Sequence, residues 1–207
     1  MDKIDVLSML RKEKLISVVR IDSKQTEEVI DAIIAGGIKF IEVTLTMDNA
    51  LEILKNVASK HKGEEVAIGA GTVVDVVSAR LAITNGAKFI VAPTFDKDIA
   101  ELCNLYRVAY IPGIHNPNDI VTALKAGCDL LKLFPASTLE PFVIKEFKGP
   151  FPQARFIISG KVNEKTANEW LNYGADAVCL GSALTNQEKN GLDKVTEKAK
   201  EFVQLVK

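Results

Sequence analysis

Short apolar segments alternate with longer amphipathic segments along the whole chain. The short segments are rich in β-branched residues, and the longer ones repeat their apolar positions at the spacing of an α-helix. Such alternation is typical of repeated βα units, in which each strand is followed by a helix and the strands form a parallel sheet. The eight expected strands are residues 15–19, 38–45, 66–71, 88–93, 109–113, 130–135, 155–160 and 177–181.

These eight units predict a closed barrel. No linker rich in Pro, Gly or Ser divides them, and their connections are short, which favours a barrel over an open doubly wound sheet. Residues 1–14 interleave charged and apolar side chains at helical spacing. We therefore expect the α/β class, with a single (β/α)8 TIM barrel over residues 1–207 and an extra N-terminal helix.

Four of the expected strands begin with a common pattern: a glycine, a small or aliphatic residue, then lysine or aspartate. The glycines are Gly37, Gly86, Gly127 and Gly174, and the left-handed turn that ends a helix explains each of them. Because the pattern fixes strand register, residues five positions after each glycine are expected to share one layer of side chains inside the barrel. That layer is Glu42, Val91, Lys132 and Cys179. Two residues earlier on the same face lies a wholly apolar layer that is expected to plug the barrel: Phe40, Phe89, Leu130 and Ala177.

Glu42 and Lys132 are thus predicted to face each other inside the barrel, on the second and sixth strands. A buried lysine is costly to desolvate unless it is paired or neutral. One interpretation is structural, with Lys132 paired to Glu42 or reaching solvent. The other is chemical: burial lowers the pKa of the Lys132 amine, which then forms a Schiff base with a carbonyl compound while Glu42 moves protons.

Glycine-rich strand ends predict an anion site at the barrel mouth. The third strand ends in GAGTV, where the backbone at Gly71 and the hydroxyl of Thr72 can approach a carboxylate or phosphate. The loops after the seventh and eighth strands are the usual phosphate site of such barrels. In this chain those loops contain Ser159, Gly160, Gly181 and Ser182.

Composition narrows the class of partner. With 26 Lys and Arg against 27 Asp and Glu, the net charge is −1, and the missing basic excess argues against nucleic acid and membrane surfaces. No apolar run approaches the ~18 residues of a membrane span, so we expect a cytoplasmic protein. Three scattered cysteines and two histidines favour neither a disulfide framework nor a metal site.

Six motifs together resemble one enzyme family. IEVTL with Glu42, GAGTV with Thr72, VAP with Pro93, IPGI, KLFPA with Lys132 and GPFPQ follow one another over nearly the whole chain. This set resembles the 2-keto-3-deoxy-6-phosphogluconate (KDPG) aldolases, a family that includes the 4-hydroxy-2-oxoglutarate (KHG) aldolases. The resemblance implies a metal-independent class I aldolase without a cofactor, commonly a homotrimer. It would release pyruvate from a small keto acid, together with D-glyceraldehyde 3-phosphate or, from KHG, glyoxylate.

The resemblance also implies roles for residues. Lys132 would form the Schiff base and Glu42 would be the general acid and base. Thr72 and the adjoining backbone at Gly71 would hold the pyruvate carboxylate, and Pro93 and Phe134 would form walls of the pocket.

The chain departs from the family at two positions. Many members have an arginine for the carboxylate where this chain has Thr46, and we hypothesise that Arg20, at the end of the first strand, supplies that charge. The family usually has two glycines after the seventh strand, whereas this chain has Gly160 and Lys161. Lys161 would either narrow the phosphate site or add a cation to it.

Three alternatives stay open. The substrate could be the galactonate-derived isomer of KDPG. The chain could be a phosphate-binding barrel isomerase in which Lys132 acts only through its charge, or a binding barrel without catalytic activity.

Overall fold

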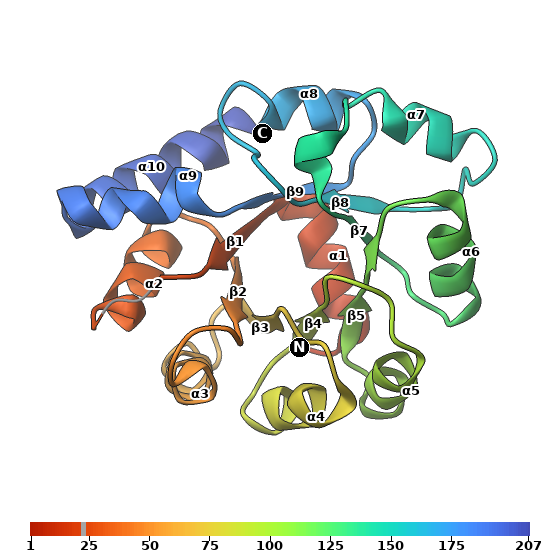
Figure 1. Cartoon of the computed structure of the whole chain (residues 1–207). Coiled ribbons are helices and arrows are strands. Elements are labelled where there is room, and N and C mark those ends of the chain that lie inside the picture. The colour runs from red at the N-terminus through yellow and green to blue at the C-terminus, as the bar shows by residue number, and fades with distance from the viewer. Residues whose placement is uncertain (22–23) are drawn as a thin grey trace.

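A ring of parallel strands with helices around it forms the architecture of the chain (Figure 1). This is a computed structural model, and it describes residues 1–21 and 24–207. Strands and helices alternate in the order predicted from the sequence. The strands are β1 (Leu15–Val19), β2 (Phe40–Thr44), β3 (Ala67–Gly71), β4 (Phe89–Val91), β5 (Ala109–Ile111), β6 (Gly113–Ile114), β7 (Leu131–Leu133), β8 (Phe156–Ile158) and β9 (Ala177–Leu180).

The helices outside the ring are amphipathic. Several begin at a polar N-cap: the side chains of Asp96 and Asn116 accept hydrogen bonds from the first-turn amides of α5 and α6. The helices are α1 (Lys3–Glu13), α2 (Thr26–Ala35), α3 (Ala50–Lys60), α4 (Val76–Thr84), α5 (Lys97–Tyr106), α6 (Pro117–Lys125), α7 (Val143–Lys148), α8 (Ala167–Asn172), α9 (Ser182–Thr185) and α10 (Leu192–Leu205), with 3-10 turns at Ala136–Thr138 and Asn186–Asn190.

The described chain has nine strands rather than the eight expected, because the predicted fifth strand is interrupted. Pro112 separates β5 from β6, and proline has no amide hydrogen to continue the ladder. The hydrogen-bonded order runs β5-β4-β3-β2-β1-β9-β8-β7-β6. Since β5 and β6 are consecutive parts of one segment, this order closes on itself. The prediction of a (β/α)8 barrel is confirmed. β5 and β6 together form the fifth of its eight strands.

The barrel interior is filled by apolar side chains near the N-terminal ends of the strands. The predicted plug residues Phe40, Phe89, Leu130 and Ala177 all belong to one buried interior cluster, and the rings of Phe40 and Phe89 lie 5.8 Å apart. Helix α1 is seen within the ring of strands in Figure 1. Its buried residues Val6 and Leu10 join the same cluster, so the predicted extra N-terminal helix closes the lower end of the barrel.

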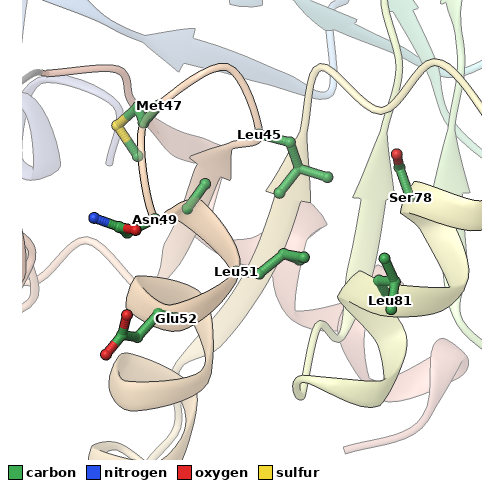
Figure 2. A pocket seen from close by; sticks show the side chains of 8 residues that line it. Leu45, Met47, Asn49, Leu51, Glu52, Ser78 and Leu81 are labelled. Atoms are coloured by element: carbon green, nitrogen blue, oxygen red, sulfur yellow. The ribbon is translucent and has the colours of Figure 1, made fainter.

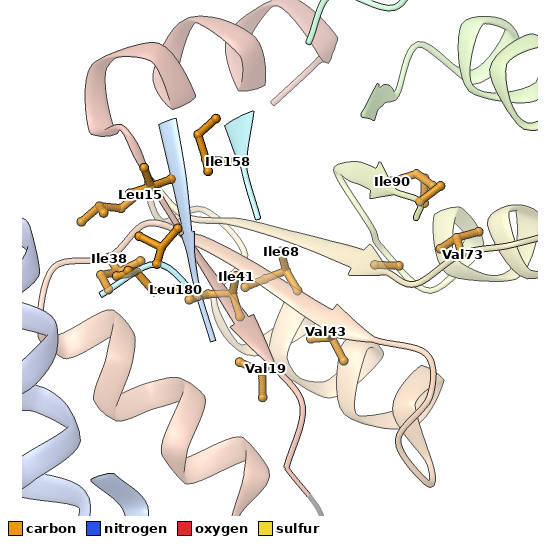
Figure 3. Packing of buried hydrophobic residues seen from close by; sticks show 14 of the residues in the cluster. Leu15, Val19, Ile38, Ile41, Val43, Ile68, Val73, Ile90, Ile158 and Leu180 are labelled. Atoms are coloured by element: carbon orange, nitrogen blue, oxygen red, sulfur yellow. The ribbon is translucent and has the colours of Figure 1, made fainter. Parts of the chain in front are cut away.

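A second, larger cluster lies between the strands and the outer helices. The outward side chains of β1, β2 and β3, among them Val19, Ile41 and Ile68, pack in it together with helix residues (Figure 3). Strand residues therefore alternate between an interior layer and this outer layer. This alternation directs the side chain of every second strand residue toward the barrel axis. Among the described residues, no helix is both long and apolar enough to cross a membrane.

Candidate active site

Glu42 and Lys132 face each other inside the barrel. They lie at the centres of β2 and β7, which stand opposite each other in the ring. Nζ of Lys132 is 3.7 Å from Oε1 of Glu42, and the two side chains are 8% and 1% exposed. The glycine repeat therefore predicted the position of this pair correctly: both side chains occupy the layer above the apolar plug.

The carboxylate of Glu42 accepts no hydrogen bond from the residues that the structure describes. Both of its oxygens are buried, and the Lys132 amine, 3.7 Å from Oε1, lies beyond hydrogen-bonding distance. Buried polar groups in folded proteins are nearly always hydrogen-bonded, because burying one without a partner is destabilising. The Lys132 amine, which neighbours Glu42, lies 5.4 Å from the centre of the Phe134 ring. Both groups can therefore bond to a molecule that enters the barrel.

Cys179 lies in the same layer, on β9. Its side chain is buried, and burial raises the pKa of the thiol to about 12, although the neighbouring amine of Lys132 acts in the opposite direction. A thiol with so high a pKa is protonated at neutral pH and is a poor nucleophile. Lys132 is therefore the stronger nucleophile of the layer once its amine is deprotonated.

A cavity of about 310 Å³ opens at the carboxyl ends of β1, β8 and β9. It carries two cationic side chains, Arg20 and Lys161, and no carboxylate among its lining residues. Seven of the residues predicted from the sequence line it together, although they come from separate motifs. They are Arg20, Phe134, Ser159, Gly160, Lys161, Gly181 and Ser182.

The loop after β8 gives this cavity its outer wall. Gly160 has φ +125°, and a Cβ there would lie 3.0 Å from the amide nitrogen of Ala136, so a glycine lets the loops after β7 and β8 pack closely. The amide of Ala136 donates to the carbonyl of Ser159 at 2.9 Å. Lys161 follows with φ +54° and is exposed at the rim. The loop therefore presents a cation at the rim of the cavity.

The remaining predicted residues lie on other sides of the mouth, outside the lining of this cavity. Thr72 follows β3 in a left-handed conformation, with φ +57°. Thr46 follows β2, and its hydroxyl donates to the hydroxyl of Thr44 at 3.5 Å. The Thr44 hydroxyl in turn donates to the carbonyl of Val19 at 3.0 Å. Pro93 lines a neighbouring cavity, of about 510 Å³, that shares Phe134 with the first.

Sequence reasoning missed Thr185 and Asn186, which line the cationic cavity. They lie at the end of α9 and follow no recognisable motif. Only their position could have indicated them: they follow Gly181 and Ser182, the predicted phosphate loop, by a few residues. His115, to which the sequence assigned no role, lines the second cavity, and its backbone amide donates to the carboxylate of Asp119.

No group of three or more potential metal ligands was found in residues 1–21 and 24–207. The chemistry that this arrangement can perform is that of an amine and a carboxylate under a cationic opening. An unprotonated amine can condense with a carbonyl group, and a carboxylate within reach can move the protons that such a condensation requires.

Comparison with known proteins identifies an enzyme family that this chain resembles. The model of the family described as "KDPG and KHG aldolase" matches residues 6–198. A protein of Pseudoalteromonas atlantica named 2-dehydro-3-deoxy-phosphogluconate aldolase is 31% identical over 186 residues, which cover 88% of this chain and 86% of the relative. Glu42 and Lys132 both lie within the residues that the family model matches.

Solved structures agree with the sequence comparison. The 2-keto-3-deoxy-6-phosphogluconate aldolase of Zymomonas mobilis, crystallised with 3-phosphoglycerate, has a TM-score of 0.86 at 29% identity, covering 95% of this chain and 94% of the other. The KDPG aldolase of Legionella pneumophila, with pyruvate captured as a covalent carbinolamine, has a TM-score of 0.86 at 25% identity, covering 94% and 96%. The likeness thus spans the whole barrel of each enzyme.

Proposed function

The chain belongs to the KDPG and KHG aldolase family, and from this we propose that it cleaves KDPG to pyruvate and D-glyceraldehyde 3-phosphate through a Schiff base on Lys132. The observation that carries the proposal is the 3.7 Å approach of the Lys132 amine to the unbonded carboxylate of Glu42 inside the barrel. The captured pyruvate carbinolamine of the Legionella pneumophila enzyme supports the same covalent chemistry here.

The reaction begins at the amine. Unprotonated Lys132 adds to the C2 ketone of the substrate, and loss of water from the carbinolamine gives an iminium ion. Glu42 then accepts the proton of the C4 hydroxyl while the C3–C4 bond breaks. The electron pair of that bond moves into the iminium, which leaves an enamine, and the aldehyde departs.

The second half of the reaction restores the enzyme. The enamine carbon takes back a proton from Glu42 and becomes the iminium ion of pyruvate. Water adds to this ion, and pyruvate leaves as the Lys132 amine is released. Glu42 thus accepts one proton and returns one, so it ends each turnover as a carboxylate. Buried surroundings suit both steps, because they keep bulk water from protonating the enamine.

Two parts of the mouth would hold the two anionic ends of the substrate. Thr72 and the backbone at Gly71 would bind the carboxylate of the keto acid, on the β3 side. The cationic cavity, with Arg20 and Lys161, would bind the phosphate. Sequence reasoning assigned Arg20 to the substrate carboxylate. However, Arg20 lines the same cavity as Ser182, which belongs to the loop expected to bind phosphate. We therefore propose the phosphate as its partner.

Removing either cation is expected to act on the phosphorylated substrate. Arg20→Ala and Lys161→Gly should each lower kcat/KM for KDPG roughly 10- to 100-fold, because each deletes one charge-assisted contact. For KHG, which has no phosphate, we expect less than about a threefold change. Glycine suits position 161 because the backbone there is left-handed.

The comparison of the two substrates decides what Arg20 binds. Aldolase assays with KDPG and KHG, run on each variant, give the ratio of the two kcat/KM values. An equal loss for both substrates in Arg20→Ala would show that Arg20 binds the shared carboxylate. No loss for either would remove Arg20 from the site. The same assays on the galactonate-derived isomer test the stereochemical preference at C4.

We also propose that the chain assembles as a homotrimer through the face formed by α3, α4 and the loop before α4. Val74, Val77 and Leu81 are exposed there, next to a cavity of about 440 Å³ whose lining includes Leu45 and Leu51. In Figure 2, Leu45 and Leu51 face Leu81 across this cavity. Exposed apolar side chains beside a hollow that is partly lined by leucines, on one molecule, fit a head-to-tail ring.

Light scattering tests this assembly. The wild type should have three times the mass of one chain. Val77→Asp should yield monomers, because it places a charge in the apolar contact. Lys161→Gly, altered at the barrel mouth, is the matched control and should stay trimeric. A wild type that is monomeric at micromolar concentration would refute the proposed assembly.

A further inference from the structure

Strand β3 places no side chain larger than a methyl group inside the barrel. Its inward positions are Ala67, Gly69 and Gly71, which alternate along the strand. Side chains of the two neighbouring strands fill the space that these residues leave. A Cβ at Gly69 would lie 2.6 Å from the ring of Phe89, and a Cβ at Gly71 would lie 1.9 Å from Oε1 of Glu42. The carboxyl group of Glu42 therefore lies directly against the backbone of Gly71.

No hydrogen bond among the described residues fixes this carboxyl group, so packing and the nearby Lys132 amine hold it in place. Within the described part of the chain, neither of its oxygens accepts a hydrogen bond, and the Lys132 amine lies 3.7 Å away. Other buried carboxylates in proteins are oriented by hydrogen-bond donors. For Glu42, the orientation depends on the shape of its surroundings, and Gly71 supplies the wall on the β3 side.

We propose that Gly71 is a positioning residue, whose missing side chain leaves the space that keeps the Glu42 carboxylate beside Lys132. This inference rests on the proposed function, and it differs from the contact between the Gly71 backbone and the substrate carboxylate. A methyl group at position 71 would also contact Cγ and Cδ of Glu42, at 2.4 and 2.5 Å. An ordinary contact between a Cβ and another heavy atom begins at 3.4 Å, whereas Oε1 of Glu42 would lie 1.9 Å from the new Cβ. The carboxyl group therefore has to move by about 1.5 Å.

A displaced Glu42 should impair only some steps of the reaction, because Lys132 and Glu42 act in different steps. Addition of the Lys132 amine to a ketone depends on the amine. Cleavage of the C3–C4 bond and protonation of the enamine depend on the position of Glu42. Displacing a reacting group by about 1 Å typically costs about 100-fold in rate. Gly71→Ala should therefore impair the proton-transfer steps while Schiff-base formation continues.

Three measurements on Gly71→Ala separate these steps. Borohydride trapping of pyruvate reports the Schiff base, and we expect it within about threefold of the wild type. Exchange of the pyruvate methyl hydrogens in D₂O reports proton transfer at the enamine, and it should fall about 100-fold. The kcat for KDPG cleavage should fall by a similar factor with little change in KM, which a general loss of folded protein would not produce.

Gly69→Ala is the matched control. It adds the same methyl group to the same face of the same strand, but against the ring of Phe89. It should lower Tm as Gly71→Ala does, while the ratio of exchange to trapping stays at the wild-type value. The double variant Glu42→Ala, Gly71→Ala removes the atoms that the new methyl group would meet. Its Tm should equal that of Glu42→Ala alone.

The outcomes divide clearly. Exchange at the wild-type rate in Gly71→Ala overturns the proposal, as does a parallel loss of exchange and trapping in both alanine variants. If Gly71→Ala does not fold but the double variant does, the contact with Glu42 is established. If neither folds, Gly71 is needed by the backbone and the proposal fails. A wild type that traps no pyruvate would instead refute the proposed function, and the Tm comparison would still test the contact.

Discussion

Replacing Lys132 is expected to abolish the aldolase reaction. Lys132→Met keeps a long side chain in the barrel but removes the amine, so no iminium ion can form. We expect kcat to fall at least about 10⁴-fold, the scale on which removal of a covalent nucleophile acts in other enzymes. A coupled assay that reports pyruvate release from KDPG measures this loss.

Lys132→Arg separates covalent chemistry from charge. A guanidinium group stays protonated at any ordinary pH, so it keeps the positive charge beside Glu42 but cannot form a Schiff base. The account predicts that this variant is as inactive as Lys132→Met. Substantial activity in the arginine variant would indicate that Lys132 acts only through its charge, as in a phosphate-binding isomerase. Lys97→Met, at an exposed helix position, is the control and should keep full activity.

Replacing Glu42 by glutamine should leave a Schiff base but stop its cleavage. Glutamine has nearly the same shape, so it fits the space over Gly71, but its amide cannot accept the C4 hydroxyl proton. We expect kcat for KDPG cleavage to fall about 10²- to 10⁴-fold. Borohydride trapping of pyruvate on the variant should stay within about tenfold of the wild type, since the amine is intact.

The Glu42→Gln result also tests the division of roles between the two residues. If cleavage and trapping were lost together, Glu42 would be needed to form the Schiff base and not only to use it. If neither were lost, the proton would go to another group, and the unbonded carboxylate beside Lys132 would have no catalytic role. Thermal melting of the variant verifies that it is folded in either case.

Much of this site could be predicted from the sequence because register repeats in a barrel. The glycine before each of four strands fixed the distance to the interior layer, and this placed Glu42 and Lys132 together although 90 residues separate them. The plug layer followed from the same count. Motif spacing also found the loops after β8 and β9, and Gly160 in the first of them allows the close packing against Ala136.

Other features depend on side-chain directions that no spacing determines. The break at Pro112 was missed because a short apolar run with an internal proline still resembled one strand. Arg20 was assigned to the substrate carboxylate because its strand neighbours β2. In the structure it lines a cavity together with residues of the loops after β8 and β9, and its ligand stays a prediction. The contact between Gly71 and Glu42 was also missed, since a glycine in GAGTV is fully explained by its backbone.

The central claim is that Lys132 forms a Schiff base with a keto acid, and reductive trapping tests it directly. Wild-type protein is incubated with pyruvate and borohydride, digested, and mapped by mass spectrometry, with Lys132→Met treated in parallel. The account predicts a stable pyruvate adduct on the peptide that contains Lys132, and none on the variant. No adduct under conditions in which the Zymomonas mobilis aldolase reacts, or an adduct at a different lysine, would contradict it.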